Sequence, residues 1–249
     1  MEEYRIDPNI AYDVVELPSK GIYYKNKKKS VKVSFLTASD ENILSSSNLL
    51  SSGTMTNELL KRKILDRDIS IDELIEEDKQ AILIFLRNTA FGTEYTVVTT
   101  DPQTDQTFSA NVDLSTLKVK DFNLQEDSNG EYTYFLNKSN VEITFTFLTV
   151  KQLKELDDLE KNWNGLGAVP VITKQIEYMI KSVGGQRDIM YIHNFVENLP
   201  IKDSQDFRKF VMTNKPGLDL TQKITTPSGD TIQVEIGFGV EFFRPFYGI

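Results

Sequence analysis

His193 is the single histidine among the 249 residues, and the chain contains no cysteine. The missing thiol excludes disulfides, cysteine nucleophiles and thiolate-bound metals, and a single imidazole excludes sites that need two. His193 could act as a general base, alone or in a Ser-His-Asp site. It lies within the apolar segment IMYIHNFV, however, where a histidine is more often found beside a core with its ring satisfied by one hydrogen bond. We therefore expect no catalytic role for His193.

Carboxylates form two clusters that could hold magnesium or, as a pair, hydrolyse a glycosidic bond. One cluster extends from Asp72 to Asp78, in the opening turns of expected helices, where the helix dipole favours acidic residues. The other contains Asp157, Asp158 and Glu160, opposite an apolar helical stripe. Both patterns favour a solvated helix face, so we expect no enzyme, no metal ligands and no cofactor. A hydrolase that uses Asp157 and Asp158 is the alternative from another functional class.

Short glycine and lysine motifs offer the remaining chemistry. The segments GLG at 165–167 and GGQ at 184–186 lack the preceding strand and the spacing of a phosphate-binding loop, and are expected to be connectors. The lysine-rich turn at 25–29, beside Tyr23 and Tyr24, could bind nucleic acid. A formal net charge of -9 opposes that interpretation, because a phosphate backbone requires a basic face. We expect no nucleic acid among the partners.

The composition is that of a folded protein, with 39% hydrophobic and 10% aromatic residues. The longest apolar run, AILIFL at 81–86, is far shorter than the roughly 18 to 20 residues that cross a bilayer. The segment MEEYRIDPNI lacks the charged and apolar regions of a secretion signal. We expect no membrane insertion, and a protein made and used in a cytoplasm or in a particle assembled there.

Residues 1–92 are expected to form a β hairpin followed by helices. Within 17–35, the turn at 26–29 is predicted to join the strands IYY and VKV. A capping box that opens at Ser70 begins the next helical part. The following helix, predicted over 76–91, is apolar almost all round at its centre, so it should lie in a core.

Residues 93–148 are predicted to form β-strands, in the alternating segments EYTVVTT, TFSANVDL, EYTYFL and VEITFTFL. Residues 149–249 return to helices, four of them before residue 215, and end in a β hairpin. One of these helices is predicted over 176–183 from its i, i+3, i+4, i+7 apolar spacing. The expected fold is α+β, a helical body with an inserted small antiparallel β meander and a C-terminal β hairpin with an aromatic tail.

The C-terminal alternation continues for eleven residues, longer than a typical strand of about five or six. The aromatic end FFRPFYGI needs an anchor, because chain ends are poorly ordered unless something holds them. We predict that strand and tail dock onto a neighbouring protein, and that deletion of residues 241–249 leaves a folded chain that fails to assemble. The predicted partner-binding residues are Ile232, Val234, Ile236, Phe238, Val240, Phe242, Phe243, Arg244, Phe246 and Tyr247.

Six segments carry a resemblance to a known family. They are VELPSKGIYY, VKVSFLTASDENIL, TNELLKRKI, IDELIEEDKQAILIFLRNTAFG, LPIKDSQDFRKFVMTNKPGLDL and TPSGDTIQVEIGFGVEFFRPF. Together, over most of the chain, they resemble the baseplate hub subunits and hub assembly proteins of contractile-tailed phages of the T-even type. The resemblance implies a non-enzymatic structural component of the virion tail baseplate, assembled in the host cytoplasm. Other baseplate and tail proteins are the implied partners, and a homo-oligomer is a further expectation.

Relatives in this family can carry a cysteine-rich knuckle where this chain has TTDPQTDQTF at 99–108. Thr99, Asp101 and Asp105 offer no thiolates, so a zinc ribbon is not expected, and the β insert must be held by its own apolar face. The family also divides between virion subunits and assembly factors. A hub assembly chaperone that is absent from the mature virion is therefore the alternative from the same biology.

Overall fold

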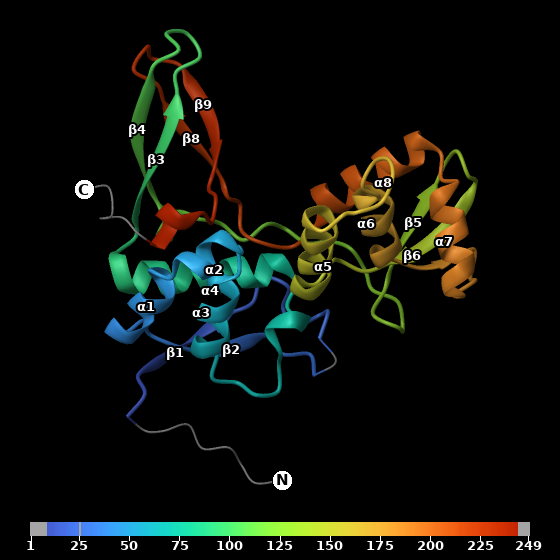
Figure 1. The fold of residues 1–249 in the computed structure, drawn as a ribbon, viewed down its shortest axis with the longest axis horizontal. Coiled ribbons are helices and arrows are strands. Elements are labelled where there is room, and N and C mark those ends of the chain that lie inside the picture. Colours follow the sequence, from blue (N-terminus) through green and yellow to red (C-terminus); the bar gives the residue numbers. More distant parts are fainter. Residues whose placement is uncertain (1–8, 25, 244–249) are drawn as a thin grey trace.

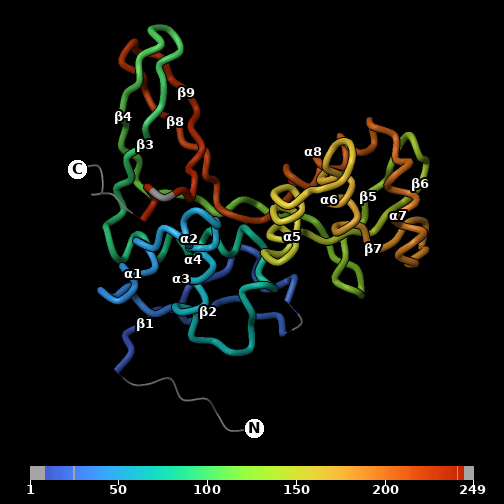
Figure 2. Tube along the Cα trace, in the orientation of Figure 1, coloured from blue at the N-terminus to red at the C-terminus, as the bar shows by residue number. Residues whose placement is uncertain are grey.

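Two hydrophobic cores organise the chain in the computed structural model, which describes residues 9–24 and 26–243. One core lies in an N-terminal lobe and the other in a C-terminal lobe, and two β hairpins project from the N-terminal lobe as a stem (Figure 1). The tube in Figure 2 shows the chain passing between the lobes in its middle and again near its end. The described elements include eight α-helices and nine strands in small antiparallel sheets, which confirms the predicted α+β class.

The N-terminal lobe packs a two-stranded sheet and three shorter helices with α4. Helix α4 follows the predicted capping box, which Ser70 opens, and ends at Gly92 as expected. Its residues Ile82, Leu83 and Leu86 are buried in the first core, because the helix is apolar almost all round. The elements of this lobe are β1 Tyr12–Glu16, β2 Ser30–Ser34, α1 Glu41–Leu44, α2 Ser47–Ser51, α3 Met55–Lys63 and α4 Glu76–Phe91.

The N-terminal hairpin uses a different first strand from the predicted one. Strand β1 pairs with β2 so that Glu16 lies opposite Ser30, and residues 17–24 and 26–29, between the two strands, belong to neither. At Gly21 the backbone has a φ of 73°, and a Cβ placed there would lie 2.4 Å from the carbonyl oxygen of Lys28. Only glycine fits this position, so the chain turns inward here instead of continuing as a strand.

A buried carboxylate holds this loop. Asp78 on the first turn of α4 accepts hydrogen bonds from the backbone nitrogen of Ser19 at 2.9 Å, from its hydroxyl at 2.5 Å and from the Tyr24 hydroxyl at 2.5 Å. Burial raises the pKa of Asp78, and the hydrogen bonds from Ser19 and Tyr24 oppose that shift. The segment LPSKGIYY therefore serves as an anchor on α4.

The stem consists of two antiparallel hairpins that lie side by side, with β4 against β8 (Figure 1). Val112, Ile224 and Val234 of these hairpins are buried and belong to the first core. The sequence predicts a single meander over 93–148, but its four strands divide between the stem and the C-terminal lobe. The strands of the stem are β3 Glu94–Thr100, β4 Thr107–Asp113, β8 Thr221–Thr225 and β9 Thr231–Glu235.

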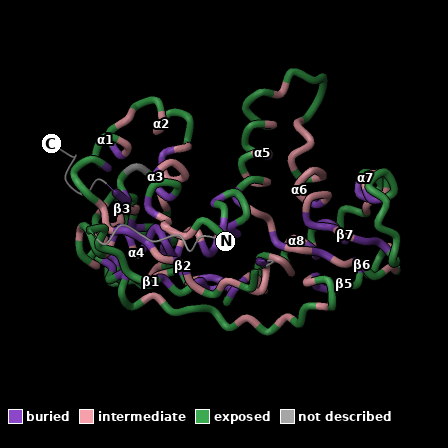
Figure 3. Tube along the Cα trace, turned by 90° about the horizontal axis from the view of Figure 1, so that it is seen from below, coloured by how far each residue is buried: buried purple, intermediate pink, exposed green. Residues whose placement is uncertain are grey.

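The C-terminal lobe contains a three-stranded antiparallel sheet, in the order β5-β6-β7, with four helices around it. Figure 3 shows buried positions along this sheet and an exposed connection between α5 and α6. Thr149 and Gln152 form the predicted capping box at the start of α5. The elements are β5 Tyr132–Leu136, β6 Val141–Phe145, α5 Val150–Lys161, α6 Val171–Met179, β7 Ile180–Val183, α7 Ile189–Glu197 and α8 Ile201–Asn214.

Strand β7 corrects the helix predicted over 176–183. Helix α6 ends at Met179, and the next four residues pair with β6. The β-branched side chains of Ile180 and Val183 suit a strand, and both are buried in the second core. Their spacing also fits a helix, so the free edge of β6 decides the outcome.

The first turn of α8 is tied to the turn between β5 and β6. Asp203 is buried and accepts hydrogen bonds from the backbone nitrogens of Lys138 at 2.9 Å and Ser139 at 2.7 Å, and from the Ser139 hydroxyl at 2.7 Å. Asp203→Ala leaves both amides without this partner, so we expect the free energy of unfolding to fall by about 1–3 kcal/mol. Urea unfolding measures the change. Asp206→Ala on the same helix, which removes a half-buried carboxylate paired with Lys202 at 2.7 Å, is the control, and an equal loss there would contradict the assignment.

The two lobes meet at an aromatic cluster. Tyr23 from the N-terminal loop packs against Phe122, Tyr132 and Phe147, with ring centroids 5.3 to 6.3 Å apart. The backbone nitrogen of Val150 also donates to the carbonyl oxygen of Leu74 at 2.7 Å. The predicted division into 1–92, 93–148 and 149–249 stays a prediction about domains.

Candidate functional site

The C-terminal segment has a different structure from the predicted long strand. Strand β9 ends at Glu235, and residues 240–243 form a 3-10 helix. The alternation of apolar side chains continues beyond the strand because these side chains enter the protein's own first core. Val234, Ile236, Phe242 and Phe243 are buried there, and Ile232 and Phe238 are partly buried against it.

Aromatic contacts fix the last described turn. The ring of Phe242 is completely buried and lies 5.4 Å from Tyr95, 4.8 Å from Phe238 and 5.1 Å from Phe243, measured between centroids. The guanidinium of Arg87 on α4 lies 5.5 Å from the centroid of the Tyr95 ring. Phe242 and Phe243 thus join the C-terminal segment to β3 and α4 within one chain.

Several of the predicted partner-binding residues are buried inside the protein by this packing. The buried side chains are occupied by intramolecular contacts, so they do not form a free docking surface in this conformation. Deletion of residues 241–249 would remove two core phenylalanines, so we now expect the shortened chain to be destabilised as well as unable to assemble. The side chain of Val240 and the residues Arg244, Phe246 and Tyr247 lie outside what the structure describes. Partner binding by this segment stays a prediction.

Hydrogen bonds join the tips of the two stem hairpins. Asp101, after β3, accepts hydrogen bonds from the backbone nitrogen of Ser228 at 3.1 Å and from its hydroxyl at 2.6 Å. Hydrogen bonds from Ser228 lower the pKa of Asp101. Gln103 Nε2 donates to Asp230 at 2.6 Å. The segment 99–108 is therefore joined to the β8–β9 hairpin through carboxylates.

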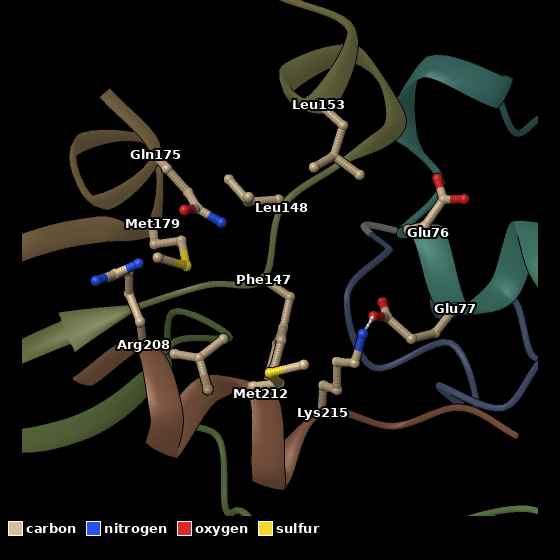
Figure 4. A pocket seen from close by; sticks show the side chains of 11 residues that line it. Glu76, Glu77, Phe147, Leu148, Leu153, Gln175, Met179, Arg208, Met212 and Lys215 are labelled. Atoms are coloured by element: carbon tan, nitrogen blue, oxygen red, sulfur yellow. Dashed lines mark ion pairs between the residues drawn. The ribbon is translucent and has the colours of Figure 1, made fainter. Parts of the chain in front are cut away.

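A cavity of about 350 Å³ lies at the junction of the two lobes (Figure 4). Phe147, Leu148 and Met179 form part of an apolar wall. Glu77 from α4 and Lys215 after α8 form an ion pair of 2.9 Å that crosses the junction. The cavity combines an apolar wall with charged groups at its border.

The first acidic cluster is only partly solvated, which corrects the sequence-based expectation for its second half. Asp72 and Glu73 are exposed, but Glu77 and Asp78 are buried. Each buried carboxylate has partners, Lys215 for Glu77 and the Ser19 loop for Asp78. These contacts join segments that lie far apart in sequence, and they explain the burial without a metal.

The second acidic cluster lies on the solvent face of α5, as predicted. Asp157, Asp158 and Glu160 are exposed, and the Asp157 carboxylate is 2.7 Å from the Lys161 ammonium one turn later. Neither aspartate lines the junction cavity. A glycosidase needs two carboxyl groups across a cleft, so this geometry does not support the hydrolase alternative.

Two lysines of the lysine-rich turn are paired with acidic neighbours. Lys27 pairs with Glu126 at 3.1 Å, and Lys28 lies 2.8 Å from Asp66 and 2.7 Å from Asp68. The adjacent Tyr23 and Tyr24 pack inward, so their rings are not presented for stacking on bases. The turn therefore offers a poor surface for nucleic acid.

His193 makes one hydrogen bond through its Nδ1, with a carboxylate as the partner. Its Nδ1 lies 2.6 Å from Oε1 of Glu177 on α6, and its side chain is 46% exposed. The neighbouring Ile192 is buried in the second core, so the histidine lies at the core's edge as expected. Glu197 on the next turn of α7 is a third possible metal ligand nearby. Sequence reasoning missed this grouping, although the four-residue spacing of His193 and Glu197 is visible.

Exposed apolar side chains gather on the C-terminal lobe. Three consecutive residues in the first turn of α7, Ile189, Met190 and Tyr191, are 81%, 63% and 47% exposed. Leu166, in the connection between α5 and α6, and Ile201, at the start of α8, are exposed as well. An exposed turn made of large apolar side chains is typical of a protein-binding surface.

Comparison with models of protein families finds a match to this chain. The family model described as T4 bacteriophage base plate protein matches residues 10–244, which is nearly the whole chain. The chain belongs to this family. It is a phage baseplate protein, and the family indicates a structural component of the virion tail that interacts with other phage tail proteins.

Membership of the baseplate family agrees with the geometry of the carboxylates and favours a non-enzymatic role. No curated protein and no solved structure matches the chain at a significant level. Among the described residues, no helix of this baseplate protein combines the length and the apolar character needed to span a bilayer.

Proposed function

We propose that this baseplate protein is a non-enzymatic component of the baseplate hub in a contractile tail, and that its C-terminal lobe binds another tail protein. The observation that carries the proposal is the first turn of α7, where Ile189, Met190 and Tyr191 are exposed together. The stem supports it further, because β3 and β9 are each bonded to one neighbouring strand only. An exposed strand edge can accept a strand from a partner.

The test combines Ile189→Ser with Met190→Ser. Both side chains are exposed, so the variant should fold normally while losing apolar contact area with a partner. We expect the number of infectious particles to fall at least roughly tenfold relative to the natural protein. Complementation of a phage that lacks this gene measures this number. Val119→Ser, after β4 and outside both the stem strands and α7, is the matched control, since Val119 is 54% exposed. Normal tails containing the double variant would contradict the proposal.

A hub assembly chaperone is the second candidate, suggested by the resemblance to a family that includes assembly factors. Mass spectrometry of purified virions separates the two, because a hub component is present there and a chaperone is absent.

A chain lacking residues 244–249 tests whether Arg244, Phe246 and Tyr247 contribute to binding, without removing Phe242 or Phe243. The mass of the chain in solution tests the expected homo-oligomer.

A further inference from the structure

Three side chains of metal-binding type meet where α6 and α7 pack together. Glu177 comes from the last turns of α6, and His193 and Glu197 come from α7. One possible ligand atom from each lies within 4.8 Å of the other two. His193 and Glu197 are four residues apart, so they lie on the same face of the helix, one turn from each other.

The donor types suit a divalent transition-metal ion. Zinc binds imidazole nitrogen at about 2.0–2.1 Å and carboxylate oxygen at about 2.0–2.2 Å. We propose that Glu177, His193 and Glu197 form a binding site for such an ion, with Zn²⁺ as the best fit. An ion between His193 Nδ1 and Glu177 Oε1 would replace their hydrogen bond of 2.6 Å. Tetrahedral geometry places two such ligand atoms about 3.3 Å apart, so the required shift is small.

The surroundings of the site support reversible binding. The Glu177 side chain is 12% exposed and held in place, whereas His193 and Glu197 are exposed enough to adjust. The Lys174 Nζ donates to Oε2 of Glu177 at 2.9 Å and the His193 Nδ1 lies 2.6 Å from its Oε1, so both carboxylate oxygens are fixed by neighbours. Zinc requires the charged carboxylate and the neutral imidazole.

Lys174 is the competing cation, because its Nζ lies 2.9 Å from Oε2 of Glu177. Two further cationic side chains close to the site have partners of their own. Arg187 pairs with Glu131 at 2.7 Å, and Lys181 donates to the carbonyl oxygen of Tyr178. Only one oxygen of Glu177 is thus shared with a lysine, and the other faces His193.

A cavity of about 310 Å³ borders the site and is lined by Glu177, His193 and Ile189 among others. Three protein ligands leave at least one coordination position open. In this site the open position is available to water or to a side chain of a docked protein. The ion would then lie beside the exposed first turn of α7.

Titration of the full chain with ZnCl₂, after treatment with a chelator, tests the proposal. We expect calorimetry to show one Zn²⁺ bound per chain. In His193→Ala and in Glu197→Gln, the affinity for Zn²⁺ should be at least roughly tenfold lower. Glu160→Gln, an exposed carboxylate on α5, is the matched control and should bind as the natural protein does. Lys174→Met should bind Zn²⁺ more tightly, because it removes the competing cation.

A second measurement needs no variant. The chain has one histidine, so the imidazole signals in a ¹H–¹⁵N spectrum report on His193 alone. These signals should shift on addition of Zn²⁺ and return on addition of a chelator. Unmoved imidazole signals, or equal Zn²⁺ affinity in His193→Ala, would overturn the proposal. Displacement of Zn²⁺ by an equal concentration of Mg²⁺ would overturn it too, since it would indicate a mere cluster of acids.

Discussion

Replacement of Phe242 by alanine is expected to lower the free energy of unfolding by about 3–5 kcal/mol. The Phe242 side chain is completely buried in the first core and contacts three aromatic rings, those of Tyr95, Phe238 and Phe243. Alanine would lose the transfer free energy of the ring and leave a cavity between β3 and the C-terminal turn. Urea unfolding, followed by circular dichroism, measures the difference.

Phe135→Ala is the matched control for this experiment. It removes the same ring from a β-strand position that is 48% exposed, so we expect a change below about 1 kcal/mol. If Phe242→Ala were as mild as the control, the C-terminal turn would be detached from the core in solution. In that case the sequence-based interpretation, in which this segment is free to bind a partner, would be restored. The experiment therefore decides between an internal and an external role for Phe242.

Local signals in the sequence predict much of the fold. The capping boxes at Ser70 and Thr149 are present, because each depends on residues three positions apart. Helix α4 has the predicted bounds, since its apolar centre and Gly92 are both local features. The four strands expected within 93–148 are also present, although they enter two sheets. Local patterns indicate which element forms, but they do not indicate its neighbours.

The errors arise where a distant segment decides the structure. Residues 180–183 become a strand because β6 offers a free edge, although their apolar spacing also fits a helix. The alternation after Glu235 continues without a strand, because the side chains enter a core formed mainly by the N-terminal lobe. Periodicity shows that one face is buried, and the identity of the burying surface is a tertiary property.

The candidate site was predictable only in part. The exposed second acidic cluster and the single hydrogen bond of His193 agree with expectation. The partner of His193 was not predictable, because Glu177 lies 16 residues earlier and on another helix. Exposure of the first turn of α7 could not be predicted either, since Ile189 and Met190 carry no local sign that they face solvent.

Asp78→Ala is expected to lower the free energy of unfolding by roughly 3 kcal/mol. The substitution leaves the Ser19 amide, the Ser19 hydroxyl and the Tyr24 hydroxyl without their buried acceptor, and each unpaired group costs about 1–3 kcal/mol. Asp78→Asn keeps the shape and one acceptor oxygen, so its loss should be smaller. Exposed Asp72→Ala, a few residues earlier, is the control and should change stability by less than about 0.5 kcal/mol.

Titration of the Asp78 carboxyl group should make the free energy of unfolding depend on pH, in a direction that its pKa shift determines. Burial, the largest influence, raises the pKa of Asp78 in the folded protein above the value of about 3.9 in an unfolded chain. The folded state therefore binds the proton more readily, and the stabilisation that results is complete below about pH 3.9 and lost as pH rises through the folded pKa. Asp78→Asn cannot titrate, so the stability of the natural protein relative to this variant should increase as pH falls from 7 towards 4. The other carboxylates are present in both chains and cancel in this difference. A relative stability that instead decreases on acidification would mean that the hydrogen bonds from Ser19 and Tyr24 outweigh burial.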